Sequence, residues 1–268
     1  MAILNMRKGL LFLFINAITI SNCIFGMVDK FSEVNQEVPQ SDLNAAKARL
    51  EELLSIHDNR FHKAIISLPP TDEFTDAIFP RTDAATSGKI YKMLAILDYI
   101  LTRHNIPYWI DGGVLLGAVR HQGLIPWDDD GDIEVFASDW NKILSLESEF
   151  KKFGYEFRGH TRLWPINQNF PFVDIVLMLR QGDKVVQLHS PEVWPDNWFY
   201  ESELFPGERL KFGPITLHAP SNPERYLKAH YGDDCLEYAL CWQHQNNGFS
   251  SPLKVKIVDF NPAPFVLK

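Results

Sequence analysis

Cysteine is scarce in this chain of 268 residues, which contains three, at Cys23, Cys235 and Cys241. Three cysteines are too few for the disulfide framework that stabilises small secreted domains. Basic residues are also outnumbered, since 26 Lys and Arg stand against 34 Asp and Glu, for a net charge of −8. Proteins that bind nucleic acid gather basic side chains against the phosphates, so this balance argues against a nucleic-acid partner. A hydrophobic content of 46% is instead typical of a globular protein stabilised by its core.

Several common functional motifs are absent. Gly88 and Lys89 lack the leading glycine and the following Ser or Thr of a P-loop. The chain contains no G-x-S-x-G, H-E-x-x-H or G-x-G-x-x-G motif and no Asn-x-Ser/Thr glycosylation site. Cys235, Cys241 and His244 are close in sequence, but this cysteine spacing is unusual for a structural zinc site. The P-loop, α/β-hydrolase, zincin and dinucleotide-binding classes are therefore disfavoured.

The N-terminal segment has the pattern of a targeting signal. Arg7 and Lys8 precede an apolar run over residues 10–20, after which polar residues return. A membrane-spanning helix needs about 20 consecutive apolar residues, so this run is short for one and closer to the apolar region of a signal peptide. We therefore predict a signal peptide or a signal anchor over residues 1–28, and a protein that is exported or attached to the membrane through this segment.

The rest of the chain divides into a linker and a domain. Residues 29–84 are predicted to form a linker or stalk that contains a helix over residues 41–56, where leucines recur at helical spacing. Residues 85–268 are predicted to form the globular domain. Its first helix is expected to begin at Thr86 or Ser87 and to run to His104.

A glycine turn follows this helix. The β-prone run from Tyr108 to Ile110 leads into Asp111, Gly112 and Gly113, after which a helical pattern returns. Glycines let the backbone approach a ligand closely, and the free amide groups at a helix N-terminus suit a phosphate. A phosphate site and a simple tight turn are both compatible with this pattern.

Five carboxylates lie within the next stretch, at Asp128, Asp129, Asp130, Asp132 and Glu134. In an extended chain alternate residues share a face, which predicts that Asp129 points away from the other four. Carboxylates about 4 Å apart repel by roughly 4 kcal/mol at an effective dielectric constant of 20, so such a row needs a cation, protons or full solvation. Mg²⁺ or Mn²⁺ is the natural cation for oxygen ligands, and a solvated acidic turn is the alternative.

One more acid, Asp174, interrupts the apolar, β-prone run from Phe170 to Leu179. A lone carboxylate in a buried strand is costly unless it is paired or bound to a metal. Asp174 is therefore a candidate site residue, and an edge strand on which it reaches solvent is the alternative.

These residues carry a family resemblance. The stretch from Asp111 to Asp130, DGGVLLGAVRHQGLIPWDDD, closely resembles the signature of the LicD family in the nucleotidyltransferase superfamily. That family includes bacterial phosphocholine transferases and the animal fukutin and fukutin-related proteins, which transfer ribitol phosphate. The resemblance extends over residues 88–235 and includes Val173-Asp174-Ile175 and, more loosely, Phe212-Gly213-Pro214 and His230-Tyr231-Gly232. It implies an α/β (α+β) fold with a nucleotidyltransferase-like mixed sheet flanked by helices and an aromatic-rich C-terminal extension.

The resemblance also implies a reaction, the metal-assisted transfer of phosphocholine or a polyol phosphate from a CDP-activated alcohol donor to a glycan. The acceptor glycan belongs to a glycoprotein, a glycolipid or a lipopolysaccharide, and a eukaryotic member works in the Golgi lumen. Asp128, Asp130, Asp132 and Asp174 are the expected ligands of Mg²⁺ or Mn²⁺. Asp174 either completes this coordination or takes the proton from the attacking hydroxyl.

Other residues of the signature are expected to bind substrate. The donor diphosphate is expected over Gly112 and Gly113. Arg120 and His121 are suited to bind a phosphate or the leaving CMP, although a capping role at the helix C-terminus is the alternative for His121. Trp127 either stacks on a ligand or packs beneath the acidic loop.

Three points stay open at this stage. Gly131 stands where the family usually has an apolar residue, which raises the expectation of a β-bulge and leaves open whether Asp128 or Asp129 joins the metal site. Acceptor selection is expected in the aromatic-rich C-terminal part, which contains Trp194, Trp198, Tyr200, Tyr226, Tyr231 and Trp242. The alternative functions are a nucleotidyltransferase that acts on a small acceptor and a pseudoenzyme that binds a metal or a sugar without turnover.

Overall fold

The computed structural model describes residues 70–71, 81–159, 161–188, 197–241 and 253–267. The predicted targeting segment 1–28 and the helix predicted at 41–56 lie outside these residues and stay predictions. The helices of the described residues are all too short or too polar to cross a membrane.

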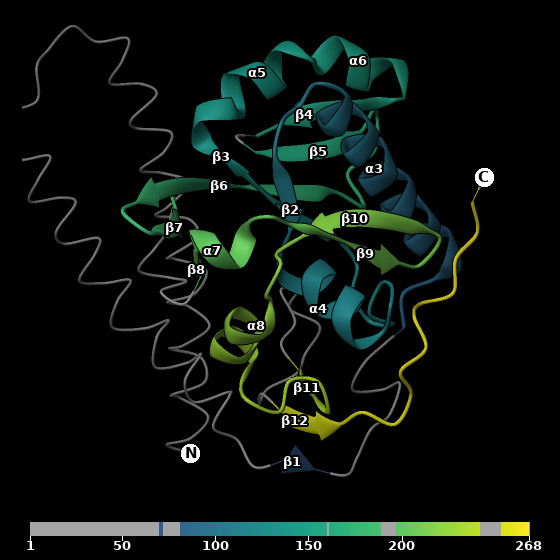
Figure 1. Ribbon diagram of the computed structural model, residues 1–268. Helices are drawn as coiled ribbons and strands as arrows, with labels where there is room; N and C mark the ends of the chain where they lie inside the picture. The colour runs from purple at the N-terminus through teal and green to yellow at the C-terminus, as the bar shows by residue number, and fades with distance from the viewer. Residues whose placement is uncertain (1–69, 72–80, 160, 189–196, 242–252, 268) are drawn as a thin grey trace, which may run out of the picture. The chain divides into compact units, whose positions relative to one another are not determined.

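Helices and strands are mixed along the chain (Figure 1). The helices are α3 (Ala84–Arg103), α4 (Gly112–Arg120), the 3-10 helix η1 (Ala137–Asp139), α5 (Trp140–Ser145), α6 (Glu147–Lys152), α7 (Glu201–Leu204) and α8 (Glu224–Tyr231). The strands are β1 (Pro70–Thr71), β2 (Tyr108–Ile110), β3 (Gly131–Phe136), β4 (Tyr155–Arg158), β5 (Arg162–Pro165), β6 (Val173–Gln181), β7 (Lys184–Gln187), β8 (Trp198–Tyr200), β9 (Glu208–Phe212), β10 (Ile215–Ala219), β11 (Tyr238–Cys241) and β12 (Leu253–Lys256).

Seven strands form the central sheet, in the order β2-β3-β6-β5-β4, with β7 beside β6 and β8 beside β7. The β3 and β6 strands run parallel, whereas β2, β5 and β7 are antiparallel to their neighbours. Helices contact this sheet, with α3 against β6, α4 against β3 and α6 against β4. The predicted α/β class, a mixed sheet flanked by helices, is confirmed.

Helix α3 begins earlier than the apolar pattern predicted. The Asp83 side chain accepts hydrogen bonds from the backbone N–H groups of Ala85 and Thr86, at 2.9 and 3.0 Å. This cap satisfies two amide groups of the first turn and moves the start of the helix to Ala84. The apolar face of α3 is fully buried and forms much of the core through Ile90, Tyr91, Met93, Leu94, Leu97, Ile100 and Leu101.

The predicted strand, glycine turn and helix are present as β2, Gly112 and α4. The helix ends at Arg120, and the chain turns at Gln122, whose φ is 54°. The expected bulge at Gly131 is not found. Strand β3 keeps an unbroken parallel register with β6, from Gly131 opposite Val173 to Phe136 opposite Met178.

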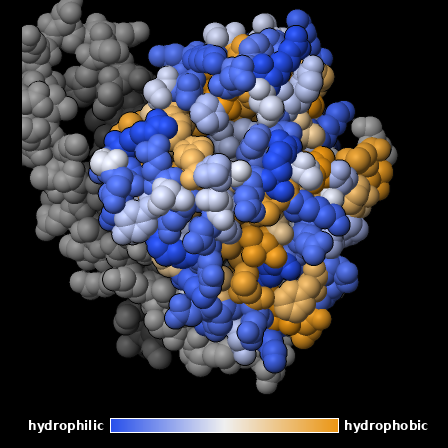
Figure 2. Space-filling model, in the orientation of Figure 1, coloured by the Kyte–Doolittle hydropathy of each residue, from blue (hydrophilic) through white to orange (hydrophobic). Residues whose placement is uncertain are grey.

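The C-terminal part packs against the rest of the domain. Strands β7 and β8 continue the central sheet, and the β9–β10 hairpin contacts β2, α3 and α4. The last segment, residues 257–267, lies against the start of α3, where the Val266 N–H donates to the Ala84 carbonyl at 2.9 Å. In Figure 2 polar side chains cover α5 and α6, whereas apolar side chains gather on the side along which the C-terminal segment runs.

Candidate active site

The predicted site residues meet at one pocket of about 860 Å³, lined by the glycine turn, the acidic loop, the first residues of β3 and β6, and α8. Eight of the nine residues predicted for the site line it: Gly112, Gly113, Arg120, Trp127, Asp128, Asp130, Asp132 and Asp174. Segments far apart in the sequence therefore come together here as expected.

Two adjacent parallel strands bring the most distant acids together. Asp132 on β3 stands directly opposite Asp174 on β6 in the parallel register. Asp130 lies two residues before Asp132, at the end of the acidic loop. Each of the three residues offers a carboxylate oxygen, and these oxygens all lie within 4.8 Å of one another. Three carboxylates at this spacing can share one hard divalent cation, which is the donor set that Mg²⁺ or Mn²⁺ prefers.

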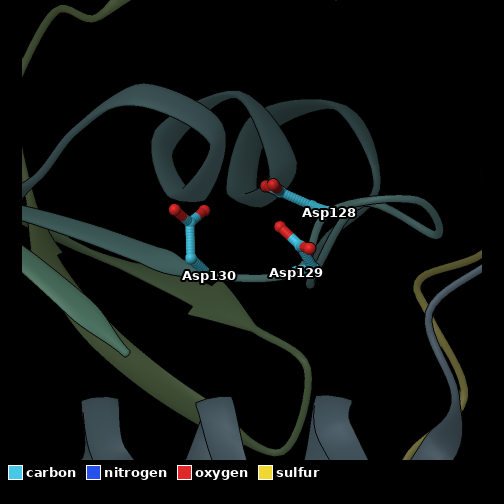
Figure 3. A group of neighbouring side chains, drawn as sticks. All are labelled: Asp128, Asp129 and Asp130. Carbon is cyan, nitrogen blue, oxygen red and sulfur yellow. The ribbon is translucent and has the colours of Figure 1, made fainter. Parts of the chain in front are cut away.

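The acidic loop forms a second, overlapping group. One carboxylate oxygen from each of Asp128, Asp129 and Asp130 also lies within 4.8 Å of the others, and Figure 3 shows these side chains on one side of the loop that leads into β3. The prediction that Asp129 points away was wrong, because β3 begins only at Gly131 and the loop before it does not alternate. Thr82 fixes this loop by donating from Oγ1 to the Asp128 carbonyl at 2.6 Å.

Alternation holds within β3 itself. Glu134, two residues after Asp132, is completely buried, and its carboxylate accepts a hydrogen bond from Nε1 of Trp109. Glu134 therefore lies on the same face as Asp132 but behind the pocket, next to β2.

The two glycines are required by close packing. Gly112 has a φ of 54°, and a Cβ atom there would lie 2.9 Å from Oδ2 of Asp132. At Gly113 a Cβ atom would lie only 2.3 Å from Oδ2 of Asp128. The acidic side chains thus reach the N-terminus of α4 only because no side chain stands in their way.

Burial and mutual repulsion raise the pKa values of these acids. Burial and then the neighbouring Asp129 raise the pKa of Asp128 to about 7. Burial, followed by the charges of the surrounding aspartates, raises the pKa values of Asp130 and Asp132 well above the ordinary value for aspartate. Raised pKa values of this origin are typical of sites that receive a cation.

Arg162 was missed by the sequence interpretation. It lies on β5 opposite Asp174 in the antiparallel register, and its Nη2 donates to Oδ2 of Asp174 at 3.2 Å, while its Nε donates to Oδ1. The guanidinium also lies over the Phe172 ring, 4.6 Å from its centre. Only the tertiary pairing of β5 with β6 brings this charge to the site, so no local motif announces it.

Arg120 and His121 are placed differently from each other. Arg120 lines the pocket wall, but its Nη1 donates to the carbonyls of Cys235 and Tyr238, at 2.7 and 3.2 Å. His121 is 2% exposed and packs edge-on against Trp127. Burial, together with the charge of Arg120, lowers the pKa of His121 to about 3, so the ring is neutral. This placement corrects the expected phosphate-binding role of His121, because a buried neutral ring offers no charge to an anion.

Comparison with known proteins gives matches over the part of the chain that contains the glycine turn, the acidic loop and Asp174. Residues 105–222 match the family model described as LicD/FKTN/FKRP, nucleotidyltransferase domain. An uncharacterized protein of Rickettsia typhi is 37% identical over 142 residues, which are 53% of this chain and 45% of the relative. The ribitol 5-phosphate transferase FKRP of Homo sapiens is 27% identical over 52% of this chain and 30% of its own length. The lipopolysaccharide cholinephosphotransferase LicD of Haemophilus influenzae is 41% identical over 20% of this chain and 21% of its own.

The extent of these matches is limited. The first two relatives, both from Rickettsia, are matched over 45% and 56% of their length, so the chain spans about half of each. Among solved structures, a lincomycin-bound lincosamide adenylyltransferase, LnuA, is similar over 57% of this chain and 98% of its own, with 16% identity and a TM-score of 0.36.

Proposed function

Because residues 105–222 match the LicD family, we propose that this protein is a metal-dependent phosphotransferase. It moves a phospho-alcohol from a CDP-activated donor to a hydroxyl group of a glycan. The observation that carries the proposal is the meeting of Asp130, Asp132 and Asp174 within 4.8 Å, beside the glycine turn that precedes α4.

The acidic residues fit the cation that this reaction requires. Asp130, Asp132 and Asp174 supply carboxylate oxygens only, and a carboxylate oxygen of Asp128 lies within 4.8 Å of one of Asp130. When bound there, Mg²⁺ or Mn²⁺ would neutralise the negative charge that develops on the transferred phosphate.

Side chains and backbone groups of the chain bind the donor and accept the proton. The glycine turn and the N-terminal amide groups of α4 receive the donor diphosphate, because this end of the helix carries partial positive charge. Arg162 lines the same pocket, and its guanidinium can hold phosphate oxygens in a bidentate contact once it leaves Asp174. Asp174 either completes the metal coordination or accepts the proton of the attacking hydroxyl.

Location follows from the N-terminal segment. We propose that residues 1–28 export the protein or anchor it in a membrane, which places the pocket in a compartment where glycans are modified. Blotting of membrane and soluble fractions, with and without this segment, tests the proposal, and an unchanged distribution contradicts it.

The reaction is tested by product analysis. Purified protein is incubated with Mn²⁺ and either CDP-alcohols or nucleoside triphosphates, in the presence of candidate glycan acceptors. Release of CMP from a CDP-alcohol supports the phosphotransferase. Release of pyrophosphate from a triphosphate supports a nucleotidyltransferase, and metal binding without turnover across the panel supports a pseudoenzyme.

A further inference from the structure

The acidic loop that carries Asp128, Asp129 and Asp130 contains no helix or strand between α4 and β3. Its three carboxylates repel one another, so the loop needs restraints that keep them together before a cation binds. Thr82 supplies two restraints. Its N–H donates to the Pro126 carbonyl at 2.8 Å, and its Oγ1 donates to the Asp128 carbonyl at 2.6 Å. A residue far from the loop in sequence therefore fixes the loop backbone at two points.

The C-terminal segment, residues 257–267, contacts the chain on both sides of these restraints. The Val266 N–H donates to the carbonyl of Ala84, the first residue of α3, at 2.9 Å. The Ala263 N–H donates to the Leu124 carbonyl at 2.8 Å, just before the acidic loop. The segment, yellow in Figure 1, thus passes the end of α4 and reaches the start of α3. Because it forms neither a helix nor a strand, we call it the C-terminal strap.

Two glycines admit the strap. Gly88 lies within α3, and a Cβ atom there would lie 2.0 Å from the Val266 carbonyl oxygen. A Cβ atom at Gly123 would lie 2.7 Å from Cβ of Pro262. Glycine is less favourable than alanine within a helix, so the glycine in α3 is explained by the close approach of the strap rather than by the helix itself.

Side chains add further contacts along the strap. The Phe265 ring packs edge-on against Tyr91, with ring centres 5.0 Å apart, and the Tyr91 hydroxyl accepts a hydrogen bond from the Leu124 N–H at 2.8 Å. The Arg81 guanidinium donates to Oδ2 of Asp259 at 3.3 Å. The strap is therefore tied to the residues beside Thr82 and to the residues that lead into the acidic loop.

We propose that the C-terminal strap and Thr82 position the acidic loop for cation binding, so that the metal affinity of the pocket depends on residues that are not themselves ligands. This inference rests on the proposed metal-dependent function. Thr82 is a positioning residue, since its two hydrogen bonds go to backbone carbonyls of the loop rather than to carboxylates. Groups that orient metal ligands typically contribute about ten- to hundredfold to metal affinity.

Calorimetric titration of the full chain with Mn²⁺ tests the role of Thr82. Thr82→Val removes the hydroxyl but keeps the branched shape and the backbone N–H. We expect it to weaken Mn²⁺ binding on the order of tenfold, and Thr82→Ser, which restores the hydroxyl, to recover most of the affinity. Thr102→Val is the matched control, because Thr102 is exposed on α3 and its hydroxyl bonds to Asp98, away from the pocket lining.

Gly88→Ala tests the strap separately. Alanine favours the helix, but its methyl group cannot coexist with the Val266 carbonyl, so the substitution displaces the strap and preserves α3. We expect Mn²⁺ to bind about three- to tenfold more weakly, because the loop keeps the Thr82 bonds but loses their support. Lys92→Ala, at an exposed position on the same helix, is the control. Circular dichroism checks that α3 persists, and hydrogen exchange at the Val266 amide checks that the strap has moved.

A double variant tests the connection between the two. If the strap acts through Thr82, Thr82→Val combined with Gly88→Ala should lose less affinity than the product of the two single losses. In all of these variants kcat at saturating Mn²⁺ should change much less than the Mn²⁺ affinity, because every ligand is still present.

The remaining outcomes overturn the inference at different points. Unchanged Mn²⁺ affinity in Gly88→Ala with a displaced strap removes the strap from the metal site, and losses that multiply in the double variant break its connection with Thr82. An equal loss in Thr102→Val assigns the effect of Thr82→Val to general destabilisation. In each of these cases the unmodified protein still binds Mn²⁺ and the proposed function stands, whereas failure of the unmodified protein to bind Mn²⁺ overturns the proposed function itself.

Discussion

Asp132 is subject to several constraints at once. Its carboxylate faces Asp174 across the parallel β3–β6 pair and approaches Gly112, and its pKa is raised by burial and by the surrounding aspartates. A residue held at such an unfavourable charge position destabilises the metal-free fold. In the proposed function, a bound cation offsets this repulsion.

The substitution Asp132→Asn separates these two effects. We expect it to lower kcat on the order of 10³-fold, because a metal ligand that contributes several kcal/mol to the transition state is lost. The fold should survive, and its metal-free Tm should rise by about 2–4 °C, since relief of repulsion worth about 1 kcal/mol has that effect in a domain of this size. The control is Asp183→Asn, an exposed aspartate in the turn between β6 and β7. A variant that retains near-normal turnover removes Asp132 from the mechanism.

Arg162 has two competing partners in the proposed reaction, and its substitution should move two affinities in opposite directions. Its ion pair with Asp174 is partly exposed, with side-chain exposures of 48% and 28%, so its contribution is small. In Arg162→Ala we expect Mn²⁺ to bind about two- to fivefold more tightly, because Asp174 is freed. The CDP donor should bind more weakly, because a phosphate contact is lost.

Calorimetric titration of Mn²⁺ and of a CDP-alcohol measures both effects. Arg180→Ala is the matched control, since Arg180 pairs with Glu201 at a similarly exposed position and does not line the pocket. Weaker binding of both ligands indicates that Arg162 supports the structure of the site, and it contradicts the competition between Asp174 and the donor phosphate.

At the scale of elements, the glycine turn determines how closely the acidic loop approaches α4. We expect Gly113→Ala to destabilise the protein by about 1–3 kcal/mol and to reduce metal affinity, because its methyl group would displace the Asp128 carboxylate. Gly131→Ala is the matched control. Its methyl group would lie 3.3 Å from Cγ2 of Val173, a contact that a small side-chain shift relieves.

Urea unfolding and Mn²⁺ titration measure both alanine variants. The free energy of unfolding of Gly131→Ala should change by less than about 1 kcal/mol. If Gly113→Ala and Gly131→Ala change the free energy of unfolding and the Mn²⁺ affinity equally, steric contact with Asp128 is not the reason why position 113 needs glycine.

Some elements of the fold were predictable from the sequence and others were not. The β2–α4 unit and the approach of Asp174 to Asp130 and Asp132 were predictable, because local periodicity and a family signature specify them. The orientation of Asp129 was not, because period-two alternation applies to a strand and the strand begins at Gly131. Helix α3 began early for a related reason, since its start is set by the capping bond of Asp83 rather than by the apolar pattern.

Contacts that depend on tertiary pairing were outside the reach of the sequence. Arg162 reaches Asp174 through the β5–β6 register, and Asn197 and Tyr226 join Asp111 through the packing of β8 and α8. Arg162, Asn197 and Tyr226 belong to no short motif.

At the scale of the whole molecule, the acidic site connects folding stability with pH and with metal binding. The net charge of −8 comes from 34 acids against 26 bases, and several of these acids are concentrated in the pocket. The folded protein holds a proton on Asp128 up to a pKa of about 7, whereas the unfolded chain releases it near pH 4. The raised pKa of Asp128 therefore costs stability as pH rises from about 4 to about 7, and the cost is constant above that range.

His121 has the opposite effect on stability and must be separated from Asp128. Its pKa is about 3 in the folded protein, so the unfolded chain takes up a proton below about pH 6.5 and stability falls as pH decreases. The two contributions overlap between about pH 4 and pH 6.5. A difference between variants at each pH isolates the aspartate, because His121 is common to both proteins.

The difference in Tm between Asp128→Asn and the unmodified protein should therefore depend on pH. In metal-free buffer we expect little gain at pH 4, where the folded protein retains the proton and the unfolded chain is only about half ionised at this residue. At pH 8 we expect a gain of roughly 8–16 °C, equivalent to about 4 kcal/mol. Saturating Mn²⁺ should reverse the order at pH 8, because the cation stabilises the unmodified protein by mass action and must displace fewer protons there than at pH 6. Differential scanning calorimetry at pH 4, 6 and 8, with EDTA or with Mn²⁺, measures all of these shifts. A Tm difference between the two proteins that is the same at every pH would show that the charge of Asp128 is not coupled to folding. A shift in Tm on adding Mn²⁺ that is the same at pH 6 and pH 8 would show that the cation binds without displacing protons from this pocket.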